Sequence, residues 1–216
     1  MTAVLSDYLR YFNRKERFFL VGWSLGNSEF TLSPDFRRSV SSAIDLPIPS
    51  EAFAAMDYHL DWLYASALFA TTGEADGVHD NGDGLISGNQ EDIDLLIAFR
   101  GEQYWNVIMI EAKGVTPWAN RQMASKARRL EGVFGRDGDR WPSIRPHFVL
   151  ASPNEPQNLD CSAWPRWMRR EDGGPYWTEM AVPPGLWRAT RCDEAGSVNK
   201  DGRHWKVVRS DRRSGA

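Results

Sequence analysis

The chain has 216 residues, of which 42% are hydrophobic and 25% are charged. It can therefore bury the core of one large domain without the help of disulfides or structural metals. Its formal net charge of −3 excludes a protein that is basic over its whole surface, so a surface that binds nucleic acid has to be a local patch. Cys161 and Cys192 lie far apart without the spacing of a zinc site or of a disulfide framework, and we expect free thiols in a reducing cytoplasm.

The N-terminal part, residues 1–48, is expected to be a helical segment. Charges interrupt residues 1–23, and no apolar run approaches the ~18 residues that cross a membrane, so we expect neither a signal peptide nor contact with a membrane. Residues 6–20 read as a helix with a blurred apolar face. The sequence SPD at 33–35 begins a clearer helix, because serine caps it, proline fits its first turn and aspartate lies near its positive end.

A second helix is expected over residues 51–70, capped by Ser50. Its apolar residues follow at helical spacing: Phe53, Met56, Leu60, Leu63 and Ala67. Residues 71–91 read as a loop with a short strand at 85–87. Part of this loop resembles a calcium-binding loop, but His79 and Gln90 stand where carboxylates belong, which favours an ordinary surface loop.

Two strands follow, DIDLLIAF at 92–99 and WNVIMIEAK at 105–113, joined by a connection of hairpin length. A helix is expected from Thr116 to Phe134, and 147–152 reads as a further buried strand. Together these elements predict an α/β fold in which helices flank a mixed sheet.

Residues 154–216 are expected to form a tryptophan-rich extension that packs on this core. Five of the ten tryptophans lie there: Trp164, Trp167, Trp177, Trp187 and Trp205. They suit aromatic anchors of a core poor in leucine and isoleucine, and the alternative is that some stack on bases. Residues 186–193 and 203–210 read as a terminal hairpin, which fits either a solubilising appendage or a DNA clamp.

The two central strands place charged residues at their ends. If their connection is centred between Glu102 and Gln103, Asp94 lies opposite Glu111, and Lys113 shares their face because side chains alternate along a strand. A slip of one residue would turn Asp94 to the other face. Two carboxylates this close are solvated, share a proton or bind a cation.

The chemistry of this set depends on which of these alternatives holds. Magnesium prefers a few carboxylate oxygens and keeps several waters. A neighbouring lysine can position or deprotonate a water, or stabilise charge in a transition state, and this combination suits hydrolysis of a phosphodiester. Alternatively, Glu111 and Lys113 are a surface ion pair that contributes less than ~1 kcal/mol.

Asp94 followed by strand, turn, strand and Glu111-Ala112-Lys113 resembles the PD-(D/E)XK nuclease superfamily, which has the restriction-endonuclease-like fold. The resemblance implies a core of helix, three strands, helix and strand within residues 49–153. It also implies that Asp94 and Glu111 bind Mg²⁺, for which Mn²⁺ would substitute, and that the Ala112 carbonyl adds a ligand. Lys113 would assist the attacking water.

Members of this superfamily often carry an acidic residue on the preceding helix, which Asp61 or Asp57 could match, with Asp61 preferred as a metal ligand. They often carry a polar residue on the following helix, which Gln122 could match as a catalytic residue. Ile93 departs from the family pattern, because it occupies the place of the motif's proline. On the following helix, three polar residues have helical spacing and suit either a solvated face or contact with phosphates: Gln122, Lys126 and Arg129.

The resemblance therefore predicts a Mg²⁺-dependent deoxyribonuclease. DNA is favoured over RNA because most relatives of this kind cut DNA. A homodimer is compatible with this prediction, since double-strand cutters of the class commonly pair two sites. The alternative is a non-catalytic module that kept the nuclease fold and binds nucleic acid or a protein.

Overall fold

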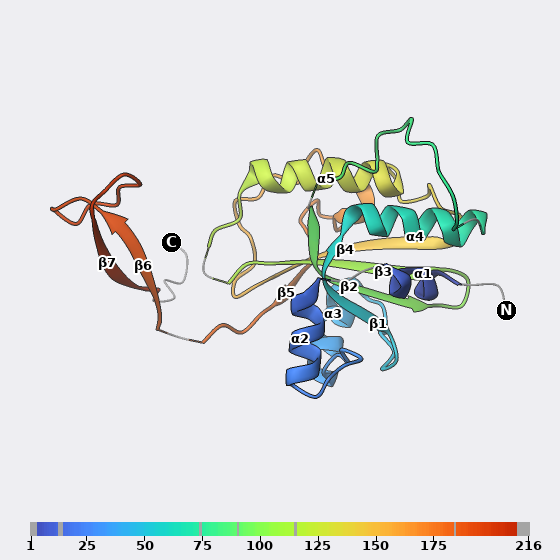
Figure 1. The fold of residues 1–216 in the computed structure, drawn as a ribbon, viewed down its shortest axis with the longest axis horizontal. Helices are drawn as coiled ribbons and strands as arrows, with labels where there is room; N and C mark the ends of the chain where they lie inside the picture. Colours follow the sequence, from blue (N-terminus) through green and yellow to red (C-terminus); the bar gives the residue numbers. More distant parts are fainter. Residues whose placement is uncertain are drawn as a thin grey trace.

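The structure is a computed structural model that describes residues 4–12, 15–73, 75–89, 91–114, 116–183 and 185–210 (Figure 1). Its helices are α1 (Leu5–Tyr11), α2 (Glu16–Ser24), α3 (Pro34–Ile44), α4 (Leu60–Thr72), α5 (Asn120–Phe134) and the short 3-10 helix η1 (Arg166–Met168). Its strands are β1 (Phe53–His59), β2 (Asp92–Arg100), β3 (Trp105–Ala112), β4 (Ile144–Ser152), β5 (Trp177–Glu179), β6 (Leu186–Cys192) and β7 (His204–Ser210).

The expected mixed α/β architecture is confirmed. Strands β1 to β5 form one sheet in the order β1-β2-β3-β4-β5, and β6 pairs with β7 in a separate two-stranded sheet. Strand β2 runs antiparallel to both β1 and β3, whereas β4 is parallel to β3 and β5 is parallel to β4. The carboxyl ends of β3, β4 and β5 and the start of β2 therefore lie at one end of the main sheet.

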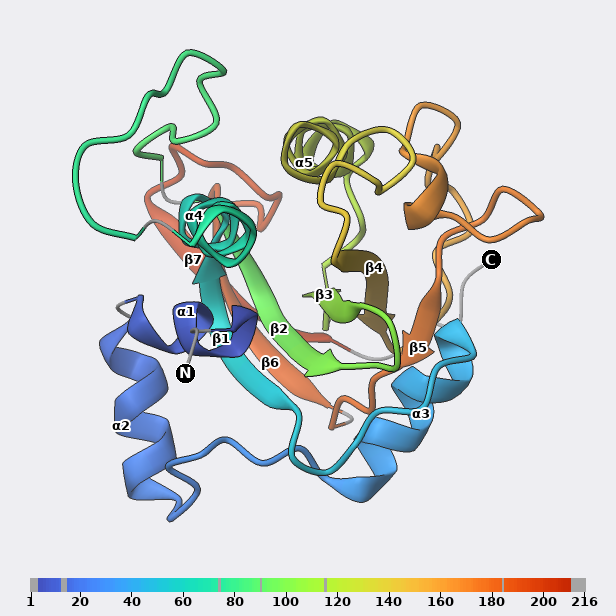
Figure 2. The same ribbon diagram turned by 90° about the vertical axis from the view of Figure 1, so that its right-hand side faces the viewer.

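Helices cover both faces of this sheet, with α4 and α5 on one side and α3 on the other (Figure 2). Because side chains alternate along a strand, each strand contributes to both layers. Val107 and Met109 of β3 belong to the core beneath α4 and α5, while Ile108 and Ile110 belong to the core against α3.

The helix expected over residues 51–70 is wrong in its first half, because residues 53–59 form strand β1 and α4 begins at Leu60. The helical spacing of the apolar residues was misleading, since pairing with β2 overrides local propensity. Asp57 interrupts the strand with a positive φ of 50°. Phe53, Ala55 and Tyr58 all lie in the same core, so the alternation of β1 changes phase at Asp57.

Other boundaries also shift. The helix expected over residues 6–20 is two helices, α1 and α2, each of which buries its own apolar residues. Residues 85–87 form no strand, and α5 begins at Asn120 rather than Thr116. Ahead of α5, Trp118 is anchored across the end of β4, where its indole Nε1 donates to Ser152 Oγ at 3.3 Å. Ser33 caps α3 as expected, accepting the Phe36 N–H at 3.3 Å.

Residues after 153 contribute to the core and to the sheet. Trp164 is buried against Phe148 of β4, with ring centroids 5.9 Å apart, and β5 is the fifth strand of the main sheet. The expected terminal hairpin is confirmed as β6 and β7, and it projects from the body of the molecule (Figure 1). Within the described ranges, no helix has both the length and the apolar character needed to cross a membrane.

Candidate active site at the end of the sheet

The register of β2 and β3 is the one expected from their short connection. Leu95 pairs with Ile110, and continuing the ladder by one residue brings Asp94 opposite Glu111. The Ala112 N–H donates to Oδ2 of Asp94 at 2.7 Å, which fixes the Asp94 carboxylate against the end of β3. The two carboxylates of the candidate site are therefore neighbours.

Glu111 is buried on the side of the sheet that α5 covers. Only 3% of its surface is exposed, and its Oε1 forms an ion pair with the Lys126 ammonium of α5. The pKa of the Glu111 carboxyl is raised from its ordinary value of 4.5 to about 7, mainly because the group is buried, and the charge of Asp94 acts in the same direction. Lys126 and Lys113 act in the opposite direction. The position thus favours added positive charge.

Lys113 follows Glu111 on the same face. Its backbone N–H donates to the Ala151 carbonyl at 2.9 Å, so the pairing of β3 with β4 continues through Lys113. Its side chain is half-buried, and its charge acts on the Glu111 carboxyl. The structure therefore brings Asp94, Glu111 and Lys113 together.

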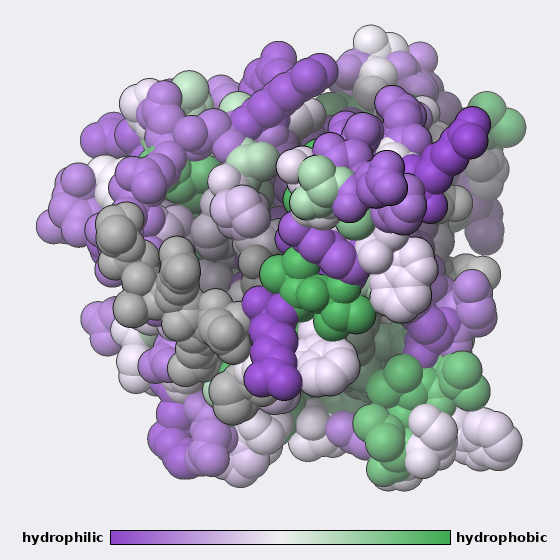
Figure 3. Space-filling view, turned by 90° about the vertical axis from the view of Figure 1, so that its left-hand side faces the viewer, coloured by the Kyte–Doolittle hydropathy of each residue, from purple (hydrophilic) through white to green (hydrophobic). Residues whose placement is uncertain are grey.

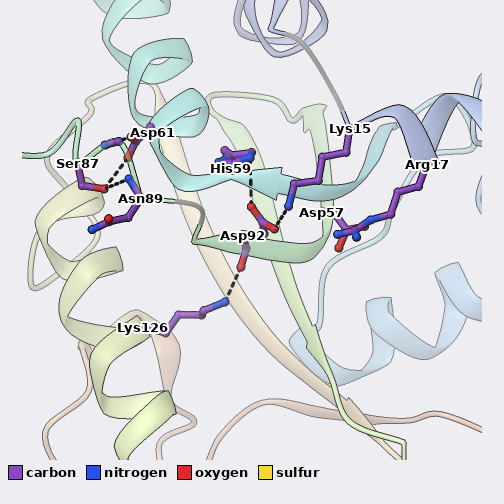
Figure 4. Close-up of polar contacts among 10 residues, drawn as sticks. Lys15, Arg17, Asp57, His59, Asp61, Ser87, Asn89, Asp92 and Lys126 are labelled. Atoms are coloured by element: carbon purple, nitrogen blue, oxygen red, sulfur yellow. Dashed lines mark hydrogen bonds and ion pairs between the residues drawn. The ribbon is translucent and has the colours of Figure 1, made fainter.

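Lys126 belongs to this group, although the sequence placed it only on a solvated or phosphate-facing helix surface. Met123 and Leu130, at helical spacing on either side of it, are fully buried, and Lys126 is buried with them. Its Nζ also donates to the Asp92 carbonyl (Figure 4). Lys126 therefore connects the start of β2 with the end of β3. The signal in the sequence was a lysine within the apolar stripe of α5.

Asp61 lies apart from this group, in the first turn of α4. Its carboxylate pairs with Arg129, accepts the Gly88 N–H at 2.8 Å and accepts the Ser87 hydroxyl at 3.3 Å (Figure 4). Both oxygens of Asp61 are therefore committed to α5 and to the loop before β2. Its role as a metal ligand stays a prediction, and these contacts do not support it.

The remaining candidates have separate placements. Asp57 pairs with Arg17 of α2 (Figure 4). Gln122 is exposed in the first turn of α5. Ala112 supplies its N–H to Asp94, and the role of its carbonyl as a metal ligand stays a prediction.

A second polar cluster adjoins the site at the start of β2. The Asp92 carboxylate pairs with Lys15, and its Oδ1 lies 3.5 Å from Nε2 of His59 (Figure 4). The His59 ring packs on Trp62 with centroids 4.1 Å apart. This cluster connects the chain ahead of α2 to the end of the sheet that carries Asp94, and no sequence pattern predicted it.

In the loop that resembles a calcium site, Asp83 stands at one of the expected ligand positions, and other groups of the protein already bind its carboxylate. Asp83 accepts the Tyr64 hydroxyl at 2.9 Å and the Leu85 N–H at 3.1 Å, and it pairs with Arg140 at 2.8 Å. Gln90 lies outside the described residues. These contacts agree with an ordinary surface loop.

The donor set at the end of the sheet is small but suits magnesium. Among the residues that the structure describes, no group of three or more histidine, cysteine, aspartate or glutamate side chains is placed to hold a metal. Asp94 uses one carboxylate oxygen for the Ala112 N–H, and Glu111 uses one for Lys126, which leaves each a second oxygen. Two carboxylates with several waters are a normal magnesium environment, so the residues fit this ion.

Comparisons of the chain with protein-family models, with curated proteins and with solved structures find no match. The function has to be inferred from the residues and their geometry.

Proposed function

We propose that the chain is a metal-dependent nuclease that hydrolyses phosphodiester bonds of DNA, with Asp94 and Glu111 holding Mg²⁺ and Lys113 assisting the attacking water. The observation that carries the proposal is the register of β2 and β3 together with the hydrogen bond from the Ala112 N–H to Asp94, which brings the Asp94 carboxylate beside the end of β3 that carries Glu111 and Lys113. The order α3, β1, β2, β3, α5, β4 supports a PD-(D/E)XK core in which α4 is an insertion between β1 and β2.

Electrostatics support a cation at this position. Glu111 and the neighbouring Asp94 place two carboxylates at the edge of a buried layer, and the pKa of about 7 at Glu111 reflects the cost of charging it there. When bound, a divalent ion neutralises carboxylates and non-bridging phosphate oxygens and lowers the pKa of a bound water. Lys126 compensates only part of the negative charge of the two carboxylates, because the pKa of Glu111 stays raised beside it.

The chain's own groups divide the remaining work. Asp94 is oriented by the Ala112 N–H, and Glu111 is oriented by Lys126, so both carboxylates are fixed before substrate arrives. Lys113 is half-buried and adjacent, and its ammonium can donate hydrogen bonds to the attacking water or to a phosphate oxygen. Its positive charge would stabilise the negative charge that develops on the phosphoryl oxygens.

The test is hydrolysis of linear and circular DNA with Mg²⁺, with Mn²⁺ and with EDTA. We expect cleavage only with a metal, and we expect Asp94→Asn, Glu111→Gln and Lys113→Ala to lower it by about 100-fold or more each. Asp35→Asn is the control, because Asp35 is exposed on the surface of α3, where it pairs with Arg38. Undiminished cleavage by Glu111→Gln and Lys113→Ala, both folded by circular dichroism, would refute the proposal.

A non-catalytic binding module is the second candidate, and the Lys126–Glu111 ion pair favours it. Lys126 neutralises Glu111 from within the protein, so the fold does not need a metal to tolerate this carboxylate. The module would bind nucleic acid or a protein equally well with and without EDTA and would never turn over substrate. Metal-dependent cleavage by the wild type decides between the two.

A further inference from the structure

The β6–β7 hairpin has one face that is open to solvent along its whole length. In this pairing Trp187 lies opposite Arg209, Ala189 opposite Val207, and Arg191 opposite Trp205. Directly paired residues point to the same side, so these three pairs share a face, here called the hairpin platform. All of the residues of the platform are exposed: Trp187, Ala189, Arg191, Trp205, Val207 and Arg209.

The two indoles of the platform are largely exposed to solvent. Trp187 is 67% exposed and Trp205 is 69% exposed, whereas Trp164 is buried in the core. The Arg209 guanidinium lies over the Trp187 ring, 5.3 Å from its centroid. Figure 3 looks at the end of the molecule from which the hairpin projects, and it shows separate hydrophobic areas among mostly hydrophilic side chains. Exposed apolar surface rimmed by charge indicates an interaction site.

The opposite face of the hairpin differs from the platform. Cys192 is buried there, and Lys206 is half-buried with its ammonium donating to the Gly196 carbonyl of the connecting loop. The loop thus covers part of this face.

The charge of the hairpin runs against that of the chain. The sequences LWRATRC and HWKVVRS of β6 and β7 contain four basic residues and no acidic one, although the chain has a net charge of −3. The acidic residues of this region, Asp193, Glu194 and Asp201, lie in the connecting loop. A cationic surface that presents indoles fits a polyanion with exposed aromatic rings.

A short connection links the hairpin platform to the end of the sheet that carries the candidate active site. Strand β5 is parallel to β3 and β4, so it ends at the same end of the sheet as Glu111. Residues 180–185 then lead to β6, and the seven steps from Glu179 to Leu186 span at most ~25 Å. This connection passes beside the site, because a Cβ placed on Gly114, the residue after Lys113, would lie 3.7 Å from Cγ2 of Val182.

We infer that the hairpin platform binds single-stranded nucleic acid, with Trp187 and Trp205 stacking on bases and Arg209 contacting phosphates. Bases in a duplex are already stacked on each other, so exposed indoles add affinity only where bases are unpaired. Arg191, the partner of Trp205, is four positions after Trp187, so the two indoles are ~13 Å apart along the strands and contact different nucleotides. That the bound strand is delivered to Asp94 and Glu111 rests on the proposed nuclease function. Binding of the strand by the platform is independent of that function.

The experiment is fluorescence anisotropy of labelled oligothymidylate, oligouridylate and a duplex of equal length, all in EDTA so that nothing is cleaved. Trp187→Ala and Trp205→Ala should each weaken single-strand binding by about 5- to 150-fold. Arg209→Ala should reduce the slope of log affinity against log salt by about 0.7. The two single-stranded probes compare binding of a DNA strand with binding of an RNA strand.

The chain supplies matched controls. Trp23 of α2 is 81% exposed on another part of the surface, and Arg188 is exposed on the opposite face of the same hairpin. Trp23→Ala and Arg188→Ala should leave single-strand affinity within about twofold of wild type, because neither touches the platform. Circular dichroism and light scattering of every variant check folding and oligomeric state.

Several results would overturn the inference. These are unchanged single-strand binding in both platform tryptophan variants, equal losses in Trp23→Ala, or a duplex bound as tightly as a single strand. A dimer that dissociates in Trp187→Ala would also do so, because it would make the platform an interface between copies. If binding depends on the platform but the wild type never cleaves DNA, the inference stands and the nuclease proposal fails. If the wild type cleaves DNA but single-strand binding does not depend on the platform, the nuclease proposal stands and the inference about the platform fails.

Discussion

The Lys126 ammonium of α5 forms an ion pair with Oε1 of Glu111, and both side chains are more than nine-tenths buried. Removing two charges from water is costly, so such a pair adds little net stability while it is intact. Removing one partner is different, because it leaves a buried charge without compensation. The pair therefore makes the stability of the protein depend on the protonation of Glu111.

Lys126→Met tests this dependence, because methionine keeps an apolar side chain in the stripe of α5 and removes the charge. We expect the free energy of unfolding to fall by roughly 3 kcal/mol at about pH 8, where Glu111 is left charged or must take up a proton. At about pH 5 the loss should be smaller, since Glu111 is then neutral. Urea unfolding at both values measures it. The double variant with Glu111→Gln should recover much of the loss, and an equal loss at both pH values contradicts the prediction.

The pH dependence of wild-type stability follows from the same residue. The Glu111 pKa is raised from 4.5 to about 7 in the folded state, so the folded state binds a proton that the unfolded state releases within this window. Its contribution is therefore full below about pH 4.5 and is lost as the pH rises toward about 7, by up to about 3 kcal/mol. Denaturant unfolding across this window measures it. Glu111→Gln cannot titrate, and parallel profiles for the two proteins would count against the prediction.

Metal binding should release protons. A pKa of about 7 means that near neutral pH Glu111 is partly protonated, and it must ionise to bind a cation, so roughly half a proton should be released per Mg²⁺ or Mn²⁺ bound. Calorimetry in buffers of different ionisation enthalpy measures this number. Asp94→Asn should weaken binding strongly, whereas Asp57→Asn, whose carboxylate pairs with Arg17, should not. Equal affinity in wild type and Asp94→Asn contradicts a site at the end of the sheet.

The register of β2 and β3 could be predicted from the sequence because a short hairpin connection leaves few alternatives, and this register sets Asp94 opposite Glu111. Strand β1 could not be predicted from the sequence, because the spacing of Phe53, Met56 and Leu60 also fits one face of a helix. Its strand conformation depends on pairing with residues of β2 that are distant in sequence. Treating this segment as the start of a helix also placed Asp61 on the helix before the first core strand, whereas α4 follows β1.

Lys126 shows a different limit. Its position in the apolar stripe of α5 was visible, but its partner depended on which face of the sheet α5 covers and on how far α5 extends over β3. A buried lysine needs a carboxylate or carbonyl partner. The packing of α5 on β3 decides that this partner is Glu111. Local patterns therefore identified the carboxylates, and tertiary packing identified the group that holds one of them.

The two lysines beside Glu111 should separate in their effects. Lys113 is half-buried after the end of β3, whereas Lys126 is buried between α5 and the sheet. Lys113→Ala should lower kcat for DNA hydrolysis by about 100-fold or more while changing the free energy of unfolding and the Mn²⁺ affinity little, because its charge is needed mainly when the phosphoryl group reacts. Lys126→Met should lower stability and alter metal affinity as well.

Steady-state kinetics, urea unfolding and Mn²⁺ calorimetry on the two variants separate these roles. Arg121→Ala is the control, because Arg121 is an exposed cation at the start of the same helix as Lys126. Losses of the same kind in Lys113→Ala and Lys126→Met would mean that both lysines only neutralise Glu111. Lys113 would then have no separate role toward the attacking water, because a group that acts on the reacting atoms changes kcat without changing the folded state.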